Sequence, residues 1–145
     1  MIVANRVENI KPSFTLQMVT KAAEMRSKGI DVINFSVGEP DFNTPKHIRQ
    51  AAKDALDQGY TKYTAGSGMI EFREAICTKL KRENGISYTP SDILVSNGEK
   101  QSLFTACQAI FNSGDSVIIF SPYWVSFPEF VKMAEAKPVL VDTLP

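Results

Sequence analysis

The chain is poor in the residues that build metal centres and disulfide frameworks. Its 145 residues include 2 cysteines, 1 histidine and 1 tryptophan. Cys77 and Cys107 fall on the apolar faces of helical patterns, so we interpret them as buried thiols rather than as a disulfide or a metal pair. Because histidine is equally scarce, the sequence predicts no metal site.

An excess of charge and a long hydrophobic run are also missing. The 16 basic residues balance 16 acidic ones, so nothing favours nucleic acid or an anionic membrane as a partner. No apolar run approaches the length of a membrane span. The N-terminal stretch MIVANRVENIKPS lacks the apolar core of a signal peptide. We therefore expect a cytoplasmic protein.

Helices and irregular loops dominate the first part of the chain. The spacing of apolar residues predicts helices over residues 13–28, 44–58 and 69–84. Thr44 is the expected N-cap of the second helix, and glycines follow the end of each one. A short strand is predicted over residues 31–36.

Beyond Gly85 the pattern changes to an alternation of strands and helices. Strands are predicted over 93–96, 117–120 and 138–141, with helices over 99–111 and 125–134 between them. This alternation indicates βαβ units and a parallel sheet, so the predicted fold class is α/β. A sheet of so few strands is thin, and we expect the chain to be a fragment or a truncated product.

Two loops in the helical part carry residues that could contact a ligand. Residues 36–42 (SVGEPDF) place a glycine, a proline and two carboxylates in one stretch, which is either a plain turn or a loop that a ligand approaches. Residues 60–68 (YTKYTAGSG) contain two tyrosines and two glycines. This stretch is either a connector with packed tyrosines or a functional loop.

Two further polar stretches directly follow predicted strands, where parallel sheets bind their ligands. In SPYWVS, residues 121–126, Trp124 is either a core residue or a platform for a flat ligand. In SNGEK, residues 96–100, a helix begins at once, and its first N–H groups have no partner within the helix. The turn matches neither the GxGxxG signature nor the P-loop signature. Two interpretations therefore stay open: a phosphate cradle, or only a capped helix.

Four motifs together resemble a known family. SVGEPDFNTP, YTAGSGMIEFREAI, SNGEKQ and SPYWVSFPE occur in this order, and the likeness runs from about Val7 to Leu144. They resemble the fold-type I aminotransferases that use pyridoxal 5′-phosphate (PLP), most of all bacterial aspartate aminotransferases, some of which accept prephenate. The resemblance implies the PLP-dependent transferase fold. Residues 1–12 would form an N-terminal arm, 13–43 the first part of the small domain, and 44–145 the start of the large PLP-binding domain.

The resemblance also assigns roles to individual residues. It implies that Gly38 contacts the substrate carboxylate through its backbone, and that Trp124 stacks on the PLP ring beside the substrate. Gly98, Glu99 and Lys100 match the triplet that holds the PLP phosphate.

Tyr63 matches a tyrosine that reaches the phosphate of the neighbouring subunit, which implies a homodimer. The Schiff-base lysine, the carboxylate at the pyridine nitrogen and the substrate-binding arginine are expected beyond Pro145. No catalytic residue is therefore assigned within this chain.

Glu99 departs from the family pattern, in which this position is usually a small residue. The phosphate contact at this position is a backbone N–H, which Glu retains. Its carboxylate suits a first helical turn but repels a phosphate dianion. Glu99 therefore either turns away or weakens cofactor binding, and Lys100 and Tyr63 could partly compensate.

Three functional interpretations follow. The intact protein transfers an amino group between an acidic amino acid, with aspartate foremost, and a 2-oxo acid through PLP. Alternatively, the chain is a non-catalytic remnant that keeps weak affinity for the PLP phosphate. The third is a small α/β domain of unrelated function, which the four ordered motifs disfavour.

Overall fold

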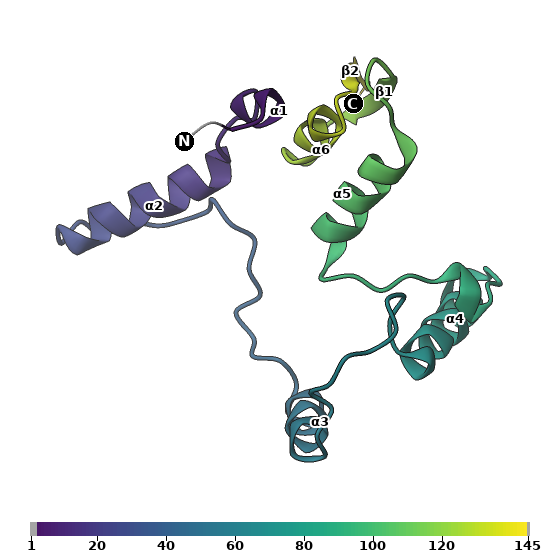
Figure 1. Ribbon diagram of the computed structural model, residues 1–145. Coiled ribbons are helices and arrows are strands. Elements are labelled where there is room, and N and C mark those ends of the chain that lie inside the picture. Colours follow the sequence, from purple (N-terminus) through teal and green to yellow (C-terminus); the bar gives the residue numbers. More distant parts are fainter. Residues whose placement is uncertain (1–2, 145) are drawn as a thin grey trace. The chain divides into compact units, whose positions relative to one another are not determined.

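The computed structural model describes residues 3–144. Figure 1 shows the elements along the chain. They are α1 (Asn5–Glu8), α2 (Phe14–Ser27), α3 (Lys46–Asp57), α4 (Ile70–Asn84), the 3₁₀ turn η1 (Pro90–Asp92), α5 (Glu99–Ile110), β1 (Ser116–Ser121), α6 (Phe127–Met133) and β2 (Lys137–Asp142). The chain forms two compact units. The first joins residues up to Glu39 with those from Leu103 onwards, and the second spans Pro40–Ser102.

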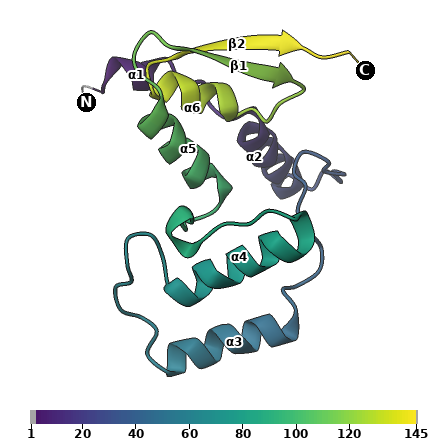
Figure 2. The ribbon, with the colours of Figure 1, turned by 90° about the vertical axis from the view of Figure 1, so that its right-hand side faces the viewer.

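The first unit contains the predicted βαβ motif. β1 and β2 pair in parallel, from Ser116 opposite Lys137 to Ser121 opposite Asp142. Figure 2 shows the two strands side by side with α6, which packs against both. The core consists of Ile119, Val131 and Ala136, with Phe111, Val117, Tyr123 and Phe127 packed around it. The parallel pairing and its crossover helix confirm the α/β prediction for this part of the chain.

The predicted helices are confirmed, with small shifts at their ends. Ser13 caps α2 by accepting the Leu16 N–H at 3.4 Å, and Gly85 ends α4 in the left-handed region at φ 70°. The predicted Thr44 cap is wrong by one residue. Pro45 is the N-cap of α3, and its carbonyl accepts the first N–H groups of the helix at 3.0 and 3.1 Å.

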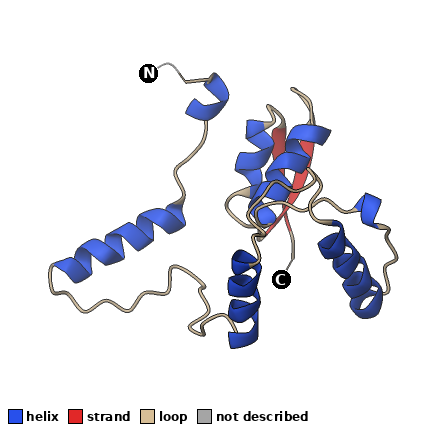
Figure 3. Cartoon of the chain, turned by 60° about the horizontal axis from the view of Figure 1, so that its bottom comes forward, coloured by secondary structure: helices blue, strands red, loops and turns tan. Residues whose placement is uncertain are grey.

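Two predicted strands are wrong. Among the described residues, Figure 3 shows strands only at β1 and β2, so residues 31–36 and 93–96 are not strands. In the first stretch the Asn34 carboxamide accepts from the Ser36 N–H at 2.9 Å and from its hydroxyl at 2.6 Å, a local pairing that competes with a strand ladder. In the second, the Val95 N–H donates to the Ser67 carbonyl of a loop at 3.0 Å, and no strand within residues 3–144 pairs with it.

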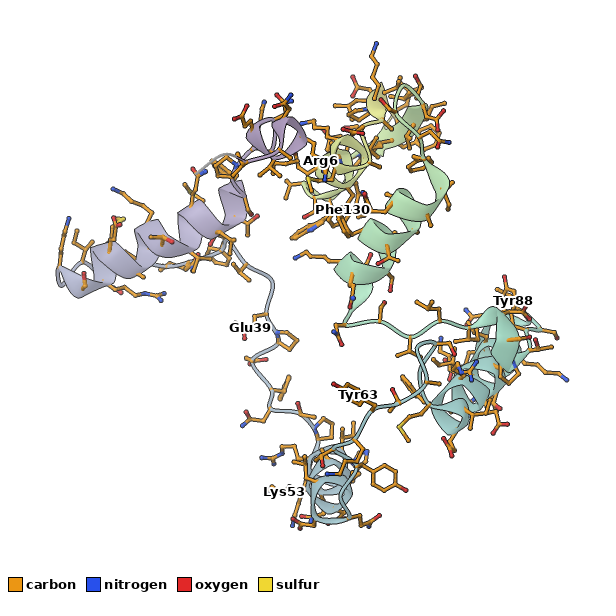
Figure 4. The ribbon with its side chains drawn as sticks, in the orientation of Figure 1. Arg6, Glu39, Lys53, Tyr63, Tyr88 and Phe130 are labelled. Carbon is orange, nitrogen blue, oxygen red and sulfur yellow. The ribbon has the colours of Figure 1, made fainter. Side chains whose placement is uncertain are left out.

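The N-terminal residues of the first unit pack beside α6. The Lys11 N–H donates to the Glu129 carboxylate at 3.4 Å, and Lys132 pairs with the same carboxylate at 2.8 Å. Phe104 of α5 meets Phe130 of α6 edge to face, with ring centroids 6.2 Å apart. Figure 4 labels Phe130 on α6. These contacts join segments that lie far apart in the sequence.

α6 ends in a conformation that glycine normally provides. The N–H groups of Glu135 and Ala136 donate to the carbonyls of Lys132 and Val131 at 2.9 and 3.1 Å, which is the Schellman pattern. Glu135 occupies its left-handed position at φ 59°. Arg6 pairs with Glu135 at 4.0 Å, and both side chains are about half exposed.

We expect Glu135→Gly to raise the free energy of unfolding by roughly 0.5–1 kcal/mol. Relief of the left-handed strain exceeds the added freedom of the unfolded chain, and an exposed ion pair contributes little. Thermal unfolding measures the change. Arg6→Ala is the control, because it removes the same ion pair and leaves the backbone unaltered. A stability loss in both variants would show that the ion pair, and not the strain, dominates.

Neither a membrane span nor a metal cluster emerges from the described part of the chain. No helix within residues 3–144 is long and apolar enough to cross a bilayer. Over the same residues, no three His, Cys, Asp or Glu side chains gather as metal ligands would. Cys77 and Cys107 are free thiols and are half-buried rather than buried, and burial raises the pKa of Cys107.

Candidate functional site

The turn that opens α5 is the most sharply defined part of the candidate site. Gly98 adopts φ 81°, and its N–H donates to the Ser96 carbonyl at 2.8 Å. The Asn97 N–H donates to the Gln101 side chain at 2.6 Å. α5 then begins at Glu99, as predicted, so the turn presents the N-terminal end of a helix of 12 residues.

The space around this turn is open. A Cβ added to Gly98 would meet no atom within 4 Å, and Glu99 and Lys100 are exposed. The N-terminus of a helix carries partial positive charge and outward-facing N–H groups. The turn can therefore accept an anion such as a phosphate, although Glu99 places one carboxylate in the same first turn.

The segment before the turn is held by two contacts, one with the Ala65–Gly68 loop and one with α4. Val95 touches the Ala65–Gly68 loop so closely that a Cβ on Gly68 would lie 2.7 Å from the Val95 Cβ. Arg73 of α4 donates from Nη1 to the Pro90 carbonyl at 2.8 Å. Together, these contacts fix the path of the chain from η1 to the turn.

η1 itself is closed by a capping box. The Asp92 carboxylate accepts from the Thr89 N–H at 2.9 Å and from the Thr89 hydroxyl at 2.7 Å. These two hydrogen bonds lower the pKa of Asp92 below its usual value, the hydroxyl contributing most. The carboxylate therefore holds the start of the segment that leads to the turn.

Trp124 belongs to the first unit and follows the carboxyl end of β1, as predicted. The residue is 49% exposed, and its carbonyl accepts the Phe127 N–H at 3.0 Å. The neighbouring Tyr123 packs against the buried core instead. Trp124 is therefore not a core residue of this unit, but its role as a ring platform stays a prediction.

Tyr63 and Gly38 lie on links between helices. Tyr63 is fully exposed at 107% and lines a groove of about 470 Å³ with Gln58, Gly59, Tyr60, Lys62, Thr64 and Met69. Figure 4 shows it on the link from α3 to α4. Gly38 lies on the link that follows α2, with no atom within 4 Å of an added Cβ. Their roles toward a partner subunit and a substrate stay predictions.

The sequence motifs do not indicate a groove that begins at Val125, the residue after Trp124. It measures about 510 Å³ and is lined by residues 10–14 together with Val125, Ser126, Glu129 and Phe130. The lining joins two ends of the chain, so no local motif could indicate it. Ser102 and Gln101 were also missed at the α5 turn, although polar residues in a first helical turn are typical capping groups.

Comparisons with known proteins agree with the four motifs. Residues 30–144 match the family model described as aminotransferase class I and II. The aspartate/prephenate aminotransferase of Thermus thermophilus is 49% identical over 142 residues, which cover 98% of this chain and 37% of that protein. The aspartate aminotransferase of Bacillus subtilis is 48% identical over 144 residues, which cover 99% of this chain and 37% of that protein.

Solved structures of such enzymes also superpose on the chain. The Thermus thermophilus aspartate aminotransferase solved with maleate gives a TM-score of 0.95 at 48% identity, over 100% of this chain and 38% of that one. The aspartate aminotransferase of Rhizobium meliloti gives 0.92 at 45% identity, over 99% and 36%. The chain thus spans little more than a third of the length of these relatives.

Proposed function

The chain belongs to the class I and II aminotransferase family, and from this premise we propose that the whole protein is a PLP-dependent aminotransferase acting on acidic amino acids. The observation that carries the proposal is the open glycine turn at the N-terminus of α5. The four sequence motifs and the match to the family model point to the same function. The names of the similar enzymes favour aspartate as the amino donor, and we propose a 2-oxo acid as the acceptor. We further propose a cytoplasmic homodimer in which residues 44–145 begin the PLP-binding domain.

The residues of the α5 turn fit the phosphate end of the cofactor. The open side of Gly98 leaves room for phosphate oxygens, and the first N–H groups of α5 are the donors such an anion needs. Trp124 would orient the ring, and the Gly38 backbone would contact the substrate carboxylate. When bound, PLP supplies the electron sink for chemistry at the α-carbon of the amino acid.

An assay of the whole protein tests the proposed function. We expect it to convert aspartate and 2-oxoglutarate to oxaloacetate and glutamate, and to use prephenate as an alternative acceptor. Valine as the donor is the control for the substrate class. The 145-residue chain by itself should give no turnover above that of free PLP, because none of its lysines matches the Schiff-base position.

Two outcomes would contradict the proposal in different ways. If the whole protein binds PLP but transfers amino groups only from valine, the acidic substrate class is wrong. If it binds no PLP, the aminotransferase function is wrong.

Tyr63 provides a separate test of the proposed dimer. We expect Tyr63→Ala and Gly98→Val to inactivate their homodimers, while a mixture of the two variants regains activity. If Tyr63 serves the neighbouring subunit, each heterodimer contains one intact site. An equal mixture should therefore reach about one quarter of wild-type activity.

The measurement is specific activity after joint refolding of the two variants. The matched control is the double variant, with both changes in one chain, refolded with wild type. That heterodimer has one defect in each of its two sites and should add no activity. No recovery in the mixture of single variants would show that Tyr63 acts within its own chain.

A further inference from the structure

Two serine side chains meet across the α5 turn. The Ser96 hydroxyl precedes the turn and forms a hydrogen bond with the Ser102 hydroxyl on α5. Ser102 also donates to the Gly98 carbonyl, from its hydroxyl at 3.4 Å and from its N–H at 3.3 Å. The pair therefore connects the residue before the turn, the glycine within it and the helix that follows.

The number of available protons couples the directions of the two hydroxyl bonds. Each hydroxyl carries one proton and can accept as well. In the arrangement in which the Ser102 hydroxyl donates to the Gly98 carbonyl, the Ser96 hydroxyl donates to the Ser102 oxygen. The two bonds to the Gly98 carbonyl are long individually, and the Ser96 hydroxyl holds the Ser102 hydroxyl in the position that makes one of them.

The orientation of the Gly98 carbonyl decides where the next N–H points. In a planar trans peptide, the C=O of one residue and the N–H of the next point in opposite directions. Because Ser102 holds the Gly98 carbonyl along α5, the Glu99 N–H faces out of the first turn. The Glu99 N–H is one of the donors expected to meet the cofactor phosphate.

We propose that Ser96 and Ser102 are positioning residues for the phosphate end of PLP. Their hydroxyl pair fixes the Gly98–Glu99 peptide plane in the orientation that a phosphate requires, before the ligand arrives. This inference rests on the proposed function, because it takes PLP as the ligand. The proposed role of the pair is to hold this peptide plane.

If Ser102 had a purely structural role, Ser102→Ala would destabilise the cofactor-free protein. The positioning role predicts no such loss. Alanine is the better helix former, and a serine bonded to the carbonyl four residues earlier slightly destabilises its helix. Ser102→Ala should therefore leave the cofactor-free protein as stable as wild type, or make it slightly more stable. A loss of phosphate affinity without a loss of stability separates the two roles.

The test measures dissociation constants of the cofactor-free whole protein for PLP and for pyridoxal, which lacks the phosphate. The preference for PLP over pyridoxal isolates the contribution of the turn. We expect Ser102→Ala to reduce this preference about threefold to tenfold, Ser102→Thr to retain most of it, and Ser96→Ala to reduce it less. The double variant should lose little more than Ser102→Ala alone, because the pair acts as a unit.

Ser91→Ala is the matched control. It removes another exposed hydroxyl pair of the same unit, Thr89 with Ser91 at 2.6 Å, and leaves the turn unaltered. The preference for PLP should not change in this variant.

Each remaining outcome overturns the inference. An unchanged preference in Ser102→Ala contradicts it while leaving the proposed function intact, provided that wild type prefers PLP. An equal loss in Ser91→Ala shows a general effect of removing hydroxyl groups. A wild-type protein without preference for PLP overturns the proposed function and this inference together.

Discussion

Gly68→Ala is expected to destabilise the Pro40–Ser102 unit by about 3 kcal/mol, through two effects that act together. The new Cβ would lie 2.7 Å from the Val95 Cβ and 2.8 Å from its Cγ2, closer than real Cβ contacts. Gly68 also adopts φ 99°, which L-residues rarely occupy. The neighbouring Ser67 carbonyl binds the Val95 N–H at 3.0 Å, so the two segments cannot separate without losing a backbone hydrogen bond.

Two other glycines separate the steric effect from the backbone effect. Gly59 has φ 81° and no atom within 4 Å of an added Cβ, so Gly59→Ala reports the backbone strain alone. Gly66 has neither a positive φ nor a close neighbour, and Gly66→Ala should leave stability nearly unchanged. The measurement is hydrogen exchange of the α4 amides in the whole protein, which follows opening of this unit.

Because Val95 leads directly into the α5 turn, Gly68→Ala should also weaken the preference for PLP over pyridoxal. Equal losses of stability in Gly68→Ala and Gly59→Ala would mean that the contact with Val95 relaxes without cost. The close approach would then have no part in shaping the turn.

Local signals in the sequence predict the helices and the βαβ motif well. The glycine after α4 and the continuous apolar run of β1 depend on near neighbours, and the structure has them where the pattern indicates. The turn at Gly98 belongs to the same class, because a strand-like run followed at once by a helical pattern fixes its place.

The errors concern features that depend on distant partners. Residues 93–96 have the composition of a strand, but their backbone pairs with a loop rather than with a strand. The apolar face predicted for α3 is not buried by the described residues, and Leu56 remains 62% exposed. Sequence periodicity identifies an apolar face but not the element that covers it.

In the candidate site, too, the sequence indicates the features set by near neighbours and not those that depend on distant partners. The sequence identifies Gly98 and Trp124 through their positions after apolar runs. It does not indicate the Ser96–Ser102 pair, because whether two hydroxyls meet depends on the angle between the turn and the helix. Nor does it indicate the groove that brings residues 10–14 to the side of α6.

Glu99→Gln is expected to tighten PLP binding about tenfold while making the cofactor-free protein slightly less stable. The substitution keeps the backbone N–H and the approximate size of the side chain, and removes only the negative charge. Glu99 is the first residue of α5, so its carboxylate and a phosphate on the same turn lie close enough to repel. Two unit charges about 6 Å apart near a protein surface repel by roughly 0.7–3 kcal/mol.

The same charge has the opposite effect when no phosphate is present. A carboxylate in a first helical turn stabilises the helix by about 0.3–1 kcal/mol, so its loss should lower the stability of the cofactor-free protein. In the absence of PLP, the Glu99 carboxylate thus partly neutralises the positive partial charge at the N-terminus of α5. When PLP binds, the same carboxylate repels its phosphate. Opposite signs for stability and affinity are the diagnostic result.

Glu71→Gln is the matched control for this prediction, because Glu71 occupies the first turn of α4, away from the glycine turn. It should cause a similar small loss of stability and leave PLP affinity unchanged. The measurements are dissociation constants for PLP and thermal unfolding of the cofactor-free protein at low and high salt. The affinity gap between Glu99→Gln and wild type should narrow as salt screens the exposed carboxylate. Unchanged affinity at low salt would mean that the Glu99 side chain turns away from the phosphate, and that the glycine turn accepts an acidic neighbour without a penalty.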